Sequence, residues 1–265
     1  MKKNNYLTRS EQLVFDIIKE TDIISIHEIE DMFPELSQNM RYKILYSLNS
    51  KGYLYRLEKG LYLVQKIPSK DPIIENPYRI ALSIFKGYIA FSSALRLYDL
   101  IEYEPFTIFV VMPNKSKKIA LGNYEIRVIS MGFRAEGLTL YKGIYVSNLE
   151  KTFFDCFYKP QYSGGYETIT KAVVGNPQLK WKNFIYYFQK YSSSSLCQRT
   201  GYILDLMNEN LNYDIPDYML RYFQSRIKTK SRLIPTAPAR GKYIPKWKLM
   251  DNLGADTILG WVNGA

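Results

Sequence analysis

Hydrophobic positions in the first 52 residues recur at helical spacing in three short segments, separated by polar stretches. Side chains three and four positions apart share one face of a helix, so this pattern predicts three amphipathic helices. Three helices this short, placed this close together, predict helix-turn-helix packing. The apolar positions are Leu13, Val14, Ile17 and Ile18 in the first segment, Ile26, Ile29, Met32 and Phe33 in the second, and Met40, Ile44, Leu45 and Leu48 in the third.

Residues suited to helix ends flank these segments. Ser10, Ser25 and Ser37 each precede an apolar run, and a serine side chain can accept a hydrogen bond from a free N–H of the first helical turn. Pro34 is expected to end the second helix, and Gly52 is suited to the left-handed residue that ends the third.

The face of the third predicted helix opposite its apolar stripe is polar and contains no acid. In a helix-turn-helix the second motif helix enters the major groove, where amide and guanidinium groups hydrogen-bond to base edges. Arg41 falls near the apolar stripe, so it either reaches the groove from the helix start or packs its stem on the second helix. The candidate DNA-contacting residues of this helix are Gln38, Asn39, Arg41, Tyr42, Lys43 and Tyr46.

Two strand-like runs, YLYRL and LYLVQ, follow Gly52 and are joined by Glu58, Lys59 and Gly60. This pattern predicts a tight hairpin, the wing of a winged helix, with Arg56 and Lys59 placed to contact phosphate. Residues 37–60 carry five bases and one acid, whereas most acids of the segment lie on the first two helices. The asymmetry favours DNA binding over the alternative that the winged helix mediates protein contacts.

The chain beyond the wing predicts a second, larger domain. Residues 67–77 hold three prolines without periodicity and are typical of a linker. After them, strand-like runs at 107–112, 124–131 and 138–147 alternate with helical segments, the longest of which lie between 149 and 223. Ser147 and Glu150 have the spacing of a capping box before the helix that ends at Pro160. We therefore expect an α+β protein: a winged helix-turn-helix at 1–66, a linker at 67–77, and a mixed domain with a small sheet and several helices at 78–265.

The net charge of +11 brings in a second candidate region. Nine bases and no acid lie between Arg221 and Lys248, interleaved with aromatic residues. Such a segment suits a phosphate backbone, in DNA or in RNA, and the alternative is a solvated basic loop. The basic residues assigned to this region are Arg221, Arg226, Lys228, Lys230, Arg232, Arg240 and Lys242, followed by Lys246 and Lys248.

The residue types needed for common catalytic and metal sites are scarce. With one histidine, His27, and two cysteines, Cys156 and Cys197, the chain does not supply the usual zinc ligands, and no Ser-His-acid set is available beyond residue 66. Asp99 and Glu125 weakly resemble the acids of a metal-dependent nuclease, which is the rival hypothesis. We expect a protein without catalytic residues, cofactor or metal. The lack of a long apolar run or an apolar signal core predicts a cytoplasmic protein that does not bind a membrane.

Several short motifs in this order resemble the AbiEi family of antitoxins and viral-defence regulators. They are GLYLV at the end of the wing, GYIAFSSALRLYDL, and VSNLEKTFFDCFYKP followed by SGGYETITKAV. The resemblance spans about residues 10–210. The matching positions are Gly60, Leu61, Tyr62, Ser93, Ala94, Leu95, Glu150, Lys151, Thr152, Asp155, Pro160, Gly164 and Gly165.

The resemblance implies a transcriptional autorepressor whose residues 1–66 bind inverted repeats in its own promoter. It also implies that the larger domain acts as an antitoxin against a nucleotidyltransferase toxin encoded beside it, without a stable complex being required. The alternative is a stand-alone winged-helix regulator whose larger domain senses a ligand. The sequence leaves the oligomeric state open, including a monomer that pairs on DNA.

Overall fold

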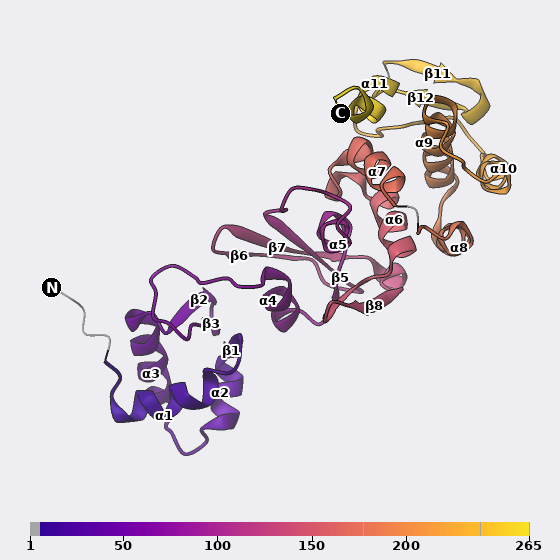
Figure 1. Cartoon of the computed structure of the whole chain (residues 1–265). Coiled ribbons are helices and arrows are strands. Elements are labelled where there is room, and N and C mark those ends of the chain that lie inside the picture. The colour runs from indigo at the N-terminus through magenta and orange to yellow at the C-terminus, as the bar shows by residue number, and fades with distance from the viewer. Residues whose placement is uncertain (1–5, 177, 239, 265) are drawn as a thin grey trace. The chain divides into compact units, whose positions relative to one another are not determined.

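The computed structural model describes residues 6–176, 178–238 and 240–264, and it has the α+β architecture expected from the sequence (Figure 1). Contacts divide the chain into two units. The first comprises Met1–Tyr88 and Phe106–Gly132, of which residues 1–5 lie outside the described part, and the second comprises Ile89–Pro105 and Phe133–Ala265.

The first unit begins with a winged helix-turn-helix, drawn in indigo and purple in Figure 1. Its helices are α1 (Arg9–Ile18), α2 (Ile26–Met32) and α3 (Gln38–Lys51). Strands β1 (Ile23–Ser25), β2 (Leu54–Glu58) and β3 (Leu61–Val64) form an antiparallel sheet in the order β1-β3-β2. The three predicted helices and the hairpin are confirmed. β1 was not predicted, because three residues are too few to show an alternating pattern.

Two of the three expected helix caps are present. The Ser25 and Ser37 side chains accept hydrogen bonds from Glu28 N and Met40 N, at 3.2 and 3.3 Å. The first helix, however, is capped by Thr8 rather than Ser10. Its third helical residue is Glu11, whose carboxylate accepts a hydrogen bond from Thr8 N and so completes a capping box that Ser10 cannot form.

The inward face of α1 differs from the predicted one. Val14 and Ile18 are buried as expected, but Leu13 and Ile17 are 61% and 55% exposed. Phe15 and the carboxylate of Glu11 take the remaining inward positions, because Glu11 forms an ion pair of 2.6 Å with Lys51 at the end of α3. The contacts of Phe15 with Tyr53 and of Glu11 with Lys51 therefore accompany a shift of the buried face of the helix by part of a turn. Met32 and Met40 are likewise 44% and 37% exposed, whereas the other predicted apolar positions of α2 and α3 are buried or half-buried.

The Glu11 carboxylate makes the winged helix sensitive to acid. Burial alone would raise its pKa, but hydrogen bonds from Lys51, Ser47 and Thr8 outweigh burial and lower the pKa to about 2. A carboxylate with a depressed pKa stabilises the folded state above its unfolded pKa of 4.5, and this contribution is lost as the pH falls towards 2.

We expect Glu11→Gln to lower the free energy of unfolding by about 1 to 3 kcal/mol at pH 7, because Lys51 keeps its charge but loses its carboxylate partner. Chemical unfolding of the full chain at pH 7 and pH 3 measures this loss, which should shrink at pH 3. Asp16→Asn is the matched control, because Asp16 pairs with Lys19 on the exposed side of the same helix. A loss that is equal at both pH values would contradict the assignment.

The first unit continues with helix α4 (Pro77–Ile84) and strands β5 (Thr107–Met112), β6 (Lys117–Leu121) and β7 (Tyr124–Ser130). Strand β7 pairs in parallel with β5, with Ile108 opposite Ile126, and antiparallel with β6. The sequence predicted all of these elements except β6. Of the expected linker at 67–77, residues 67–76 contain no helix or strand, whereas Pro77 is the first residue of α4. The position of a domain boundary there stays a prediction.

The second unit is mainly helical and is built around a buried helix, α6 (Leu149–Tyr158). α5 (Phe91–Leu97), α7 (Gly165–Val174) and α8 (Trp181–Tyr191) pack against α6, as does the longer α9 (Ser194–Leu211). Strand β4 (Tyr88–Ile89) pairs through Ile89 with β9 (Ile144–Ser147), which forms a hairpin with β8 (Leu138–Tyr141).

The cap of α6 is Asn148, whose side chain accepts a hydrogen bond from Lys151 N at 2.9 Å, rather than the predicted Ser147. Ser147 is the last residue of β9, and its hydroxyl lies 2.7 Å from the Thr152 hydroxyl in the buried interior. The predicted capping box is therefore wrong: the cap lies one residue later, and the Glu150 carboxylate accepts a hydrogen bond from Lys180 N instead.

The end of the chain forms a small folded layer on α9 and α10 (Asp217–Ser225). Strands β10 (Ser231–Arg232), β11 (Lys242–Ile244) and β12 (Leu249–Asp251) form a sheet in the order β10-β12-β11, followed by α11 (Ala255–Leu259). We refer to it as the C-terminal sheet. It contains much of the basic segment that the sequence left open as a solvated loop.

Candidate nucleic-acid interface

The outward face of α3 presents the polar side chains expected from the sequence. Gln38, Asn39 and Lys43 are exposed, and Tyr42 and Tyr46 are 50% and 76% exposed. None of these five side chains forms an ion pair or a hydrogen bond with another described residue, and α3 contains no acid. The face is therefore free to hydrogen-bond with a ligand.

Arg41 does not share this face. Its side chain is half-buried, and its guanidinium Nη1 donates a 3.0 Å hydrogen bond to the carbonyl of Phe33, the C-cap of α2. Of the two placements open to it from the sequence, Arg41 thus takes the one against α2, where it holds the turn of the helix-turn-helix. Its assignment as a DNA contact stays a prediction.

The wing has the predicted turn. Gly60 has a φ of +75°, and Arg56 and Lys59 are both exposed near the tip. Glu58, the one acid of residues 37–60, forms an ion pair with Lys117 of β6 within the same unit. That pair neutralises the negative charge of the wing and leaves its two cations without an acidic neighbour on the hairpin. The pattern of the sequence alone did not assign a role to Lys117, because β6 was not predicted.

The basic segment is almost free of ion pairs. Of its nine cations only Lys246 pairs with an acid in the described chain, at 2.6 Å from Asp205 and 3.8 Å from Glu209. The remaining eight are exposed, and they are Arg221, Arg226, Lys228, Lys230, Arg232, Arg240, Lys242 and Lys248. They lie on α10, on the C-terminal sheet and on the loops between them, all within the second unit, and together with Lys246 we refer to them as the basic region.

Buried polar residues of α9 anchor this region. The side-chain amide of Gln198 donates to the carbonyls of Thr229, Trp247 and Lys248 at 2.6 to 3.2 Å, and its oxygen accepts from the Ser231 hydroxyl at 2.6 Å. Trp247 is buried beneath the sheet, and its indole N–H donates to Asp205 at 2.7 Å. The backbone around the cations is thereby fixed.

The ring of Trp247 lies directly against Gly201 of α9. A Cβ atom at Gly201 would come within 2.2 Å of the Trp247 ring, so the glycine makes the close approach possible. Neither this contact nor the Gln198 hydrogen bonds could be anticipated from the sequence, because they join residues about 30 to 50 positions apart.

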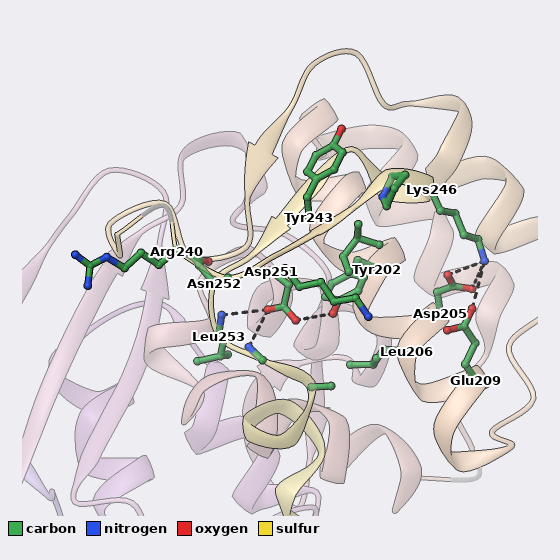
Figure 2. A pocket seen from close by; sticks show the side chains of 16 residues that line it. Tyr202, Asp205, Leu206, Glu209, Arg240, Tyr243, Lys246, Asp251, Asn252 and Leu253 are labelled. Carbon is green, nitrogen blue, oxygen red and sulfur yellow. Dashed lines mark hydrogen bonds and ion pairs between the residues drawn. The ribbon is translucent and has the colours of Figure 1, made fainter.

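Beside the C-terminal sheet lies a groove whose acidic side chains, Asp205, Glu209 and Asp251, already have partners within the chain (Figure 2). The buried carboxylate of Asp251 accepts from the Tyr202 hydroxyl at 2.7 Å and from the backbone N–H groups of Leu253 and Gly254 at 3.1 and 2.9 Å. The pKa of Tyr202 is strongly raised, mainly by burial and to a smaller extent by the hydrogen bond to Asp251. The groove is therefore a structural junction between α9 and the sheet.

The two carboxylates of the nuclease hypothesis are each held by a lysine. Asp99 lies 2.9 Å from Lys142, and Glu125 lies 3.1 Å from Lys118. Within the described residues, no three His, Cys, Asp or Glu side chains form a set that could hold a metal ion. The arrangement lends the nuclease hypothesis no support.

The segment that carries the family resemblance forms the interior of the second unit. Lys151 and Asp155 are fully buried and form an ion pair within α6, and Thr152 is buried beside them. Burial raises the pKa of Asp155 to about 6, and the Lys151 ammonium opposes this shift. These residues therefore belong to the interior of the second unit and do not line an exposed site.

The arrangement defines a class: a winged helix-turn-helix followed by a mixed α/β unit with a basic C-terminal sheet. Among solved structures, the chain is similar to the crystal structure of the Rv2827c protein from Mycobacterium tuberculosis, with a TM-score of 0.68 and 16% sequence identity. The similarity covers 99% of this chain and 97% of that one, so the two share the fold over their whole lengths. No protein-family model and no curated protein matches the chain. None of its helices, within the described part, has both the length and the apolar character needed to cross a bilayer.

Proposed function

We propose that the chain is a DNA-binding transcriptional autorepressor and the antitoxin of an AbiE-like toxin–antitoxin system. The observation that carries the DNA-binding half is the exposed face of α3, which has amide, phenol and ammonium groups, no acid and no partner within the described chain. This face belongs to a winged helix-turn-helix, a fold that places the second motif helix in the major groove.

In this mechanism, different residues contact the bases and the phosphate backbone of the DNA. Gln38 and Asn39 occupy the first turn of α3 and can donate to and accept from a base edge at the same time, with Asn suited to adenine. Tyr42, Lys43 and Tyr46 continue the same face and contact the groove and its backbone. Arg56 and Lys59 bind phosphates beside the groove, which adds affinity without sequence information. Two copies bound to an inverted repeat in the promoter of its own gene would then block transcription.

The antitoxin half rests on the AbiEi-like motifs and on the larger unit they belong to. We propose that this unit counteracts a nucleotidyltransferase toxin encoded by the neighbouring gene, with no stable complex required. A nucleotidyltransferase gene beside this one would favour the antitoxin, and its absence would favour the stand-alone regulator.

Substitutions at Asn39 and Lys59 separate the two kinds of DNA contact. We expect Asn39→Ala to weaken binding to the upstream DNA of its own gene by about five- to 150-fold, equivalent to about 1 to 3 kcal/mol, and to change binding to a scrambled duplex little. Lys59→Ala should weaken both duplexes alike and flatten the dependence of affinity on salt, because it removes one phosphate contact. Titration of labelled duplexes at two salt concentrations measures both effects.

Lys19→Ala is the matched control for this experiment. Lys19 is an exposed lysine at the end of α1 that pairs with Asp16, and its removal should leave the affinity for both duplexes unchanged. Equal losses on the two duplexes from Asn39→Ala and from Lys59→Ala would contradict the division between base and phosphate contacts.

A further inference from the structure

We infer that the outer face of the C-terminal sheet is a second nucleic-acid site, distinct from the winged helix, and that it binds a single strand. The ligand is a flexible polyanion with unpaired bases, either RNA or DNA. The inference does not rest on the proposed function, since it depends only on the geometry and charge of the second unit.

The register of the sheet shows which side chains face outward. Leu249 of β12 is fully buried, and its neighbours across the sheet are Ser231 and Ile244, so this row faces α9. Side chains alternate between the faces of a sheet. The next row, Arg232, Met250 and Tyr243, therefore faces outward.

This outer face combines an aromatic ring with cations. The Tyr243 side chain is 38% exposed, and Figure 2 shows its ring directed away from the buried Asp251. Lys230 lies two residues before Arg232, on the same side, with its ammonium 5.5 Å from the centre of the Tyr243 ring. Lys248, next to β12, is also exposed. Between residues 221 and 250 there is no acid that would repel a phosphate.

The combination favours a single strand over a duplex. Cations alone attract any polyanion, but an outward aromatic ring adds affinity only when a base is free to stack on it, which pairing in a duplex prevents. When a base stacks on Tyr243, Lys230 can leave the ring and bind a neighbouring phosphate. Because Gln198 and Trp247 fix the backbone beneath these side chains, less conformational entropy is lost on binding.

The test measures binding of the full chain to labelled 20-nucleotide oligo(U) and oligo(dT), to a duplex of the same length, and to inorganic polyphosphate. We expect either or both single strands to bind more tightly than polyphosphate, and the stronger of the two identifies RNA or DNA as the source. The winged helix of the full chain is also expected to bind a duplex, so the duplex serves to show that binding to it does not depend on Tyr243. Tyr243→Ala should weaken single-strand binding by about five- to a hundredfold, and Tyr243→Phe should retain it. Lys230→Ala with Lys248→Ala should reduce the salt dependence by about 1.4 in the logarithmic slope, from about 0.7 for each lost phosphate contact.

Two sets of variants serve as controls. Lys180→Ala with Lys182→Ala removes two other exposed lysines of the same unit and should leave binding unchanged. Asn39→Ala with Tyr42→Ala impairs the winged helix and should also leave single-strand binding unchanged, so that failure of this site and failure of the proposed function are distinguishable. Equal affinity for polyphosphate, no binding of either single strand, no effect of Tyr243→Ala, or an equal loss from Tyr243→Ala on the single strands and the duplex would overturn the inference.

Discussion

Replacing Lys151 by methionine is expected to lower the free energy of unfolding by about 3 to 5 kcal/mol at neutral pH, because it leaves the carboxylate of Asp155 buried without a counter-charge. Methionine has a similar length and fills most of the same space, so the loss reports on charge more than on volume. Equilibrium unfolding in urea, followed by circular dichroism, measures the change.

The defect should depend on pH in a defined direction. The pKa of Asp155, about 6 in the folded chain, is above its unfolded value of 3.8, so the folded state binds the proton more tightly. The stability that this proton contributes is fully present below pH 3.8 and is lost as the pH rises through 6. Without the Lys151 ammonium the pKa of Asp155 rises further. The difference in free energy of unfolding between the wild type and the Lys151→Met chain should therefore be smaller at pH 5 than at pH 7.5.

Two further variants identify the cause. Lys151→Met combined with Asp155→Asn removes both charges and should recover most of the loss. Lys171→Met removes an exposed lysine that pairs with Glu102 at 3.1 Å, and it should cost less than about 1 kcal/mol. A Lys151→Met chain as stable as the wild type at pH 7.5 would show that the buried pair does not stabilise the second unit.

Replacing Trp247 by alanine is the second change with a large expected effect. Trp247 is 1% exposed, packs against Gly201 and donates to the buried carboxylate of Asp205. We expect a loss of about 3 to 5 kcal/mol from the cavity and the broken hydrogen bond. Amide hydrogen exchange should show the loss of protection concentrated in β10, β11 and β12.

Trp247→Phe is the matched control. It keeps an aromatic ring against Gly201 and removes the indole N–H, while Lys246 still pairs with Asp205. The loss of stability should therefore be smaller than for alanine. If Trp247→Ala left the hydrogen exchange of the sheet amides unchanged, the claim that Trp247 anchors the basic region to α9 would be contradicted.

Local patterns in the sequence predicted the winged helix well. The helices and the hairpin follow from signals that involve only a few neighbouring residues. These signals are the helical spacing of apolar positions, the caps Ser25 and Ser37, and the turn glycines Gly52 and Gly60. The prediction that Leu13 and Ile17 face inward was wrong, because the inward residues Glu11 and Phe15 contact Lys51 and Tyr53, which lie about 40 positions further along the chain.

The candidate sites show the same limit. The exposed face of α3 was predictable because a helix distributes its residues at a fixed angle. The sequence allowed Arg41 either to reach the groove or to pack on α2. The observed position depends on its hydrogen bond to the carbonyl of Phe33 at the end of α2. The basic segment was recognised by charge alone, but the sheet that fixes it depends on Gln198, Gly201 and Trp247, whose contacts no periodicity reveals.

The most direct test of the central claim is binding of the purified full chain to the DNA upstream of its own gene. The comparison is a scrambled duplex of equal length, at two salt concentrations, with and without magnesium. An autorepressor that reads bases through α3 should retain its own upstream DNA, uncut, at the higher salt, while the scrambled duplex dissociates. Equal, salt-sensitive binding to both duplexes, or cleavage that requires magnesium, would contradict the claim.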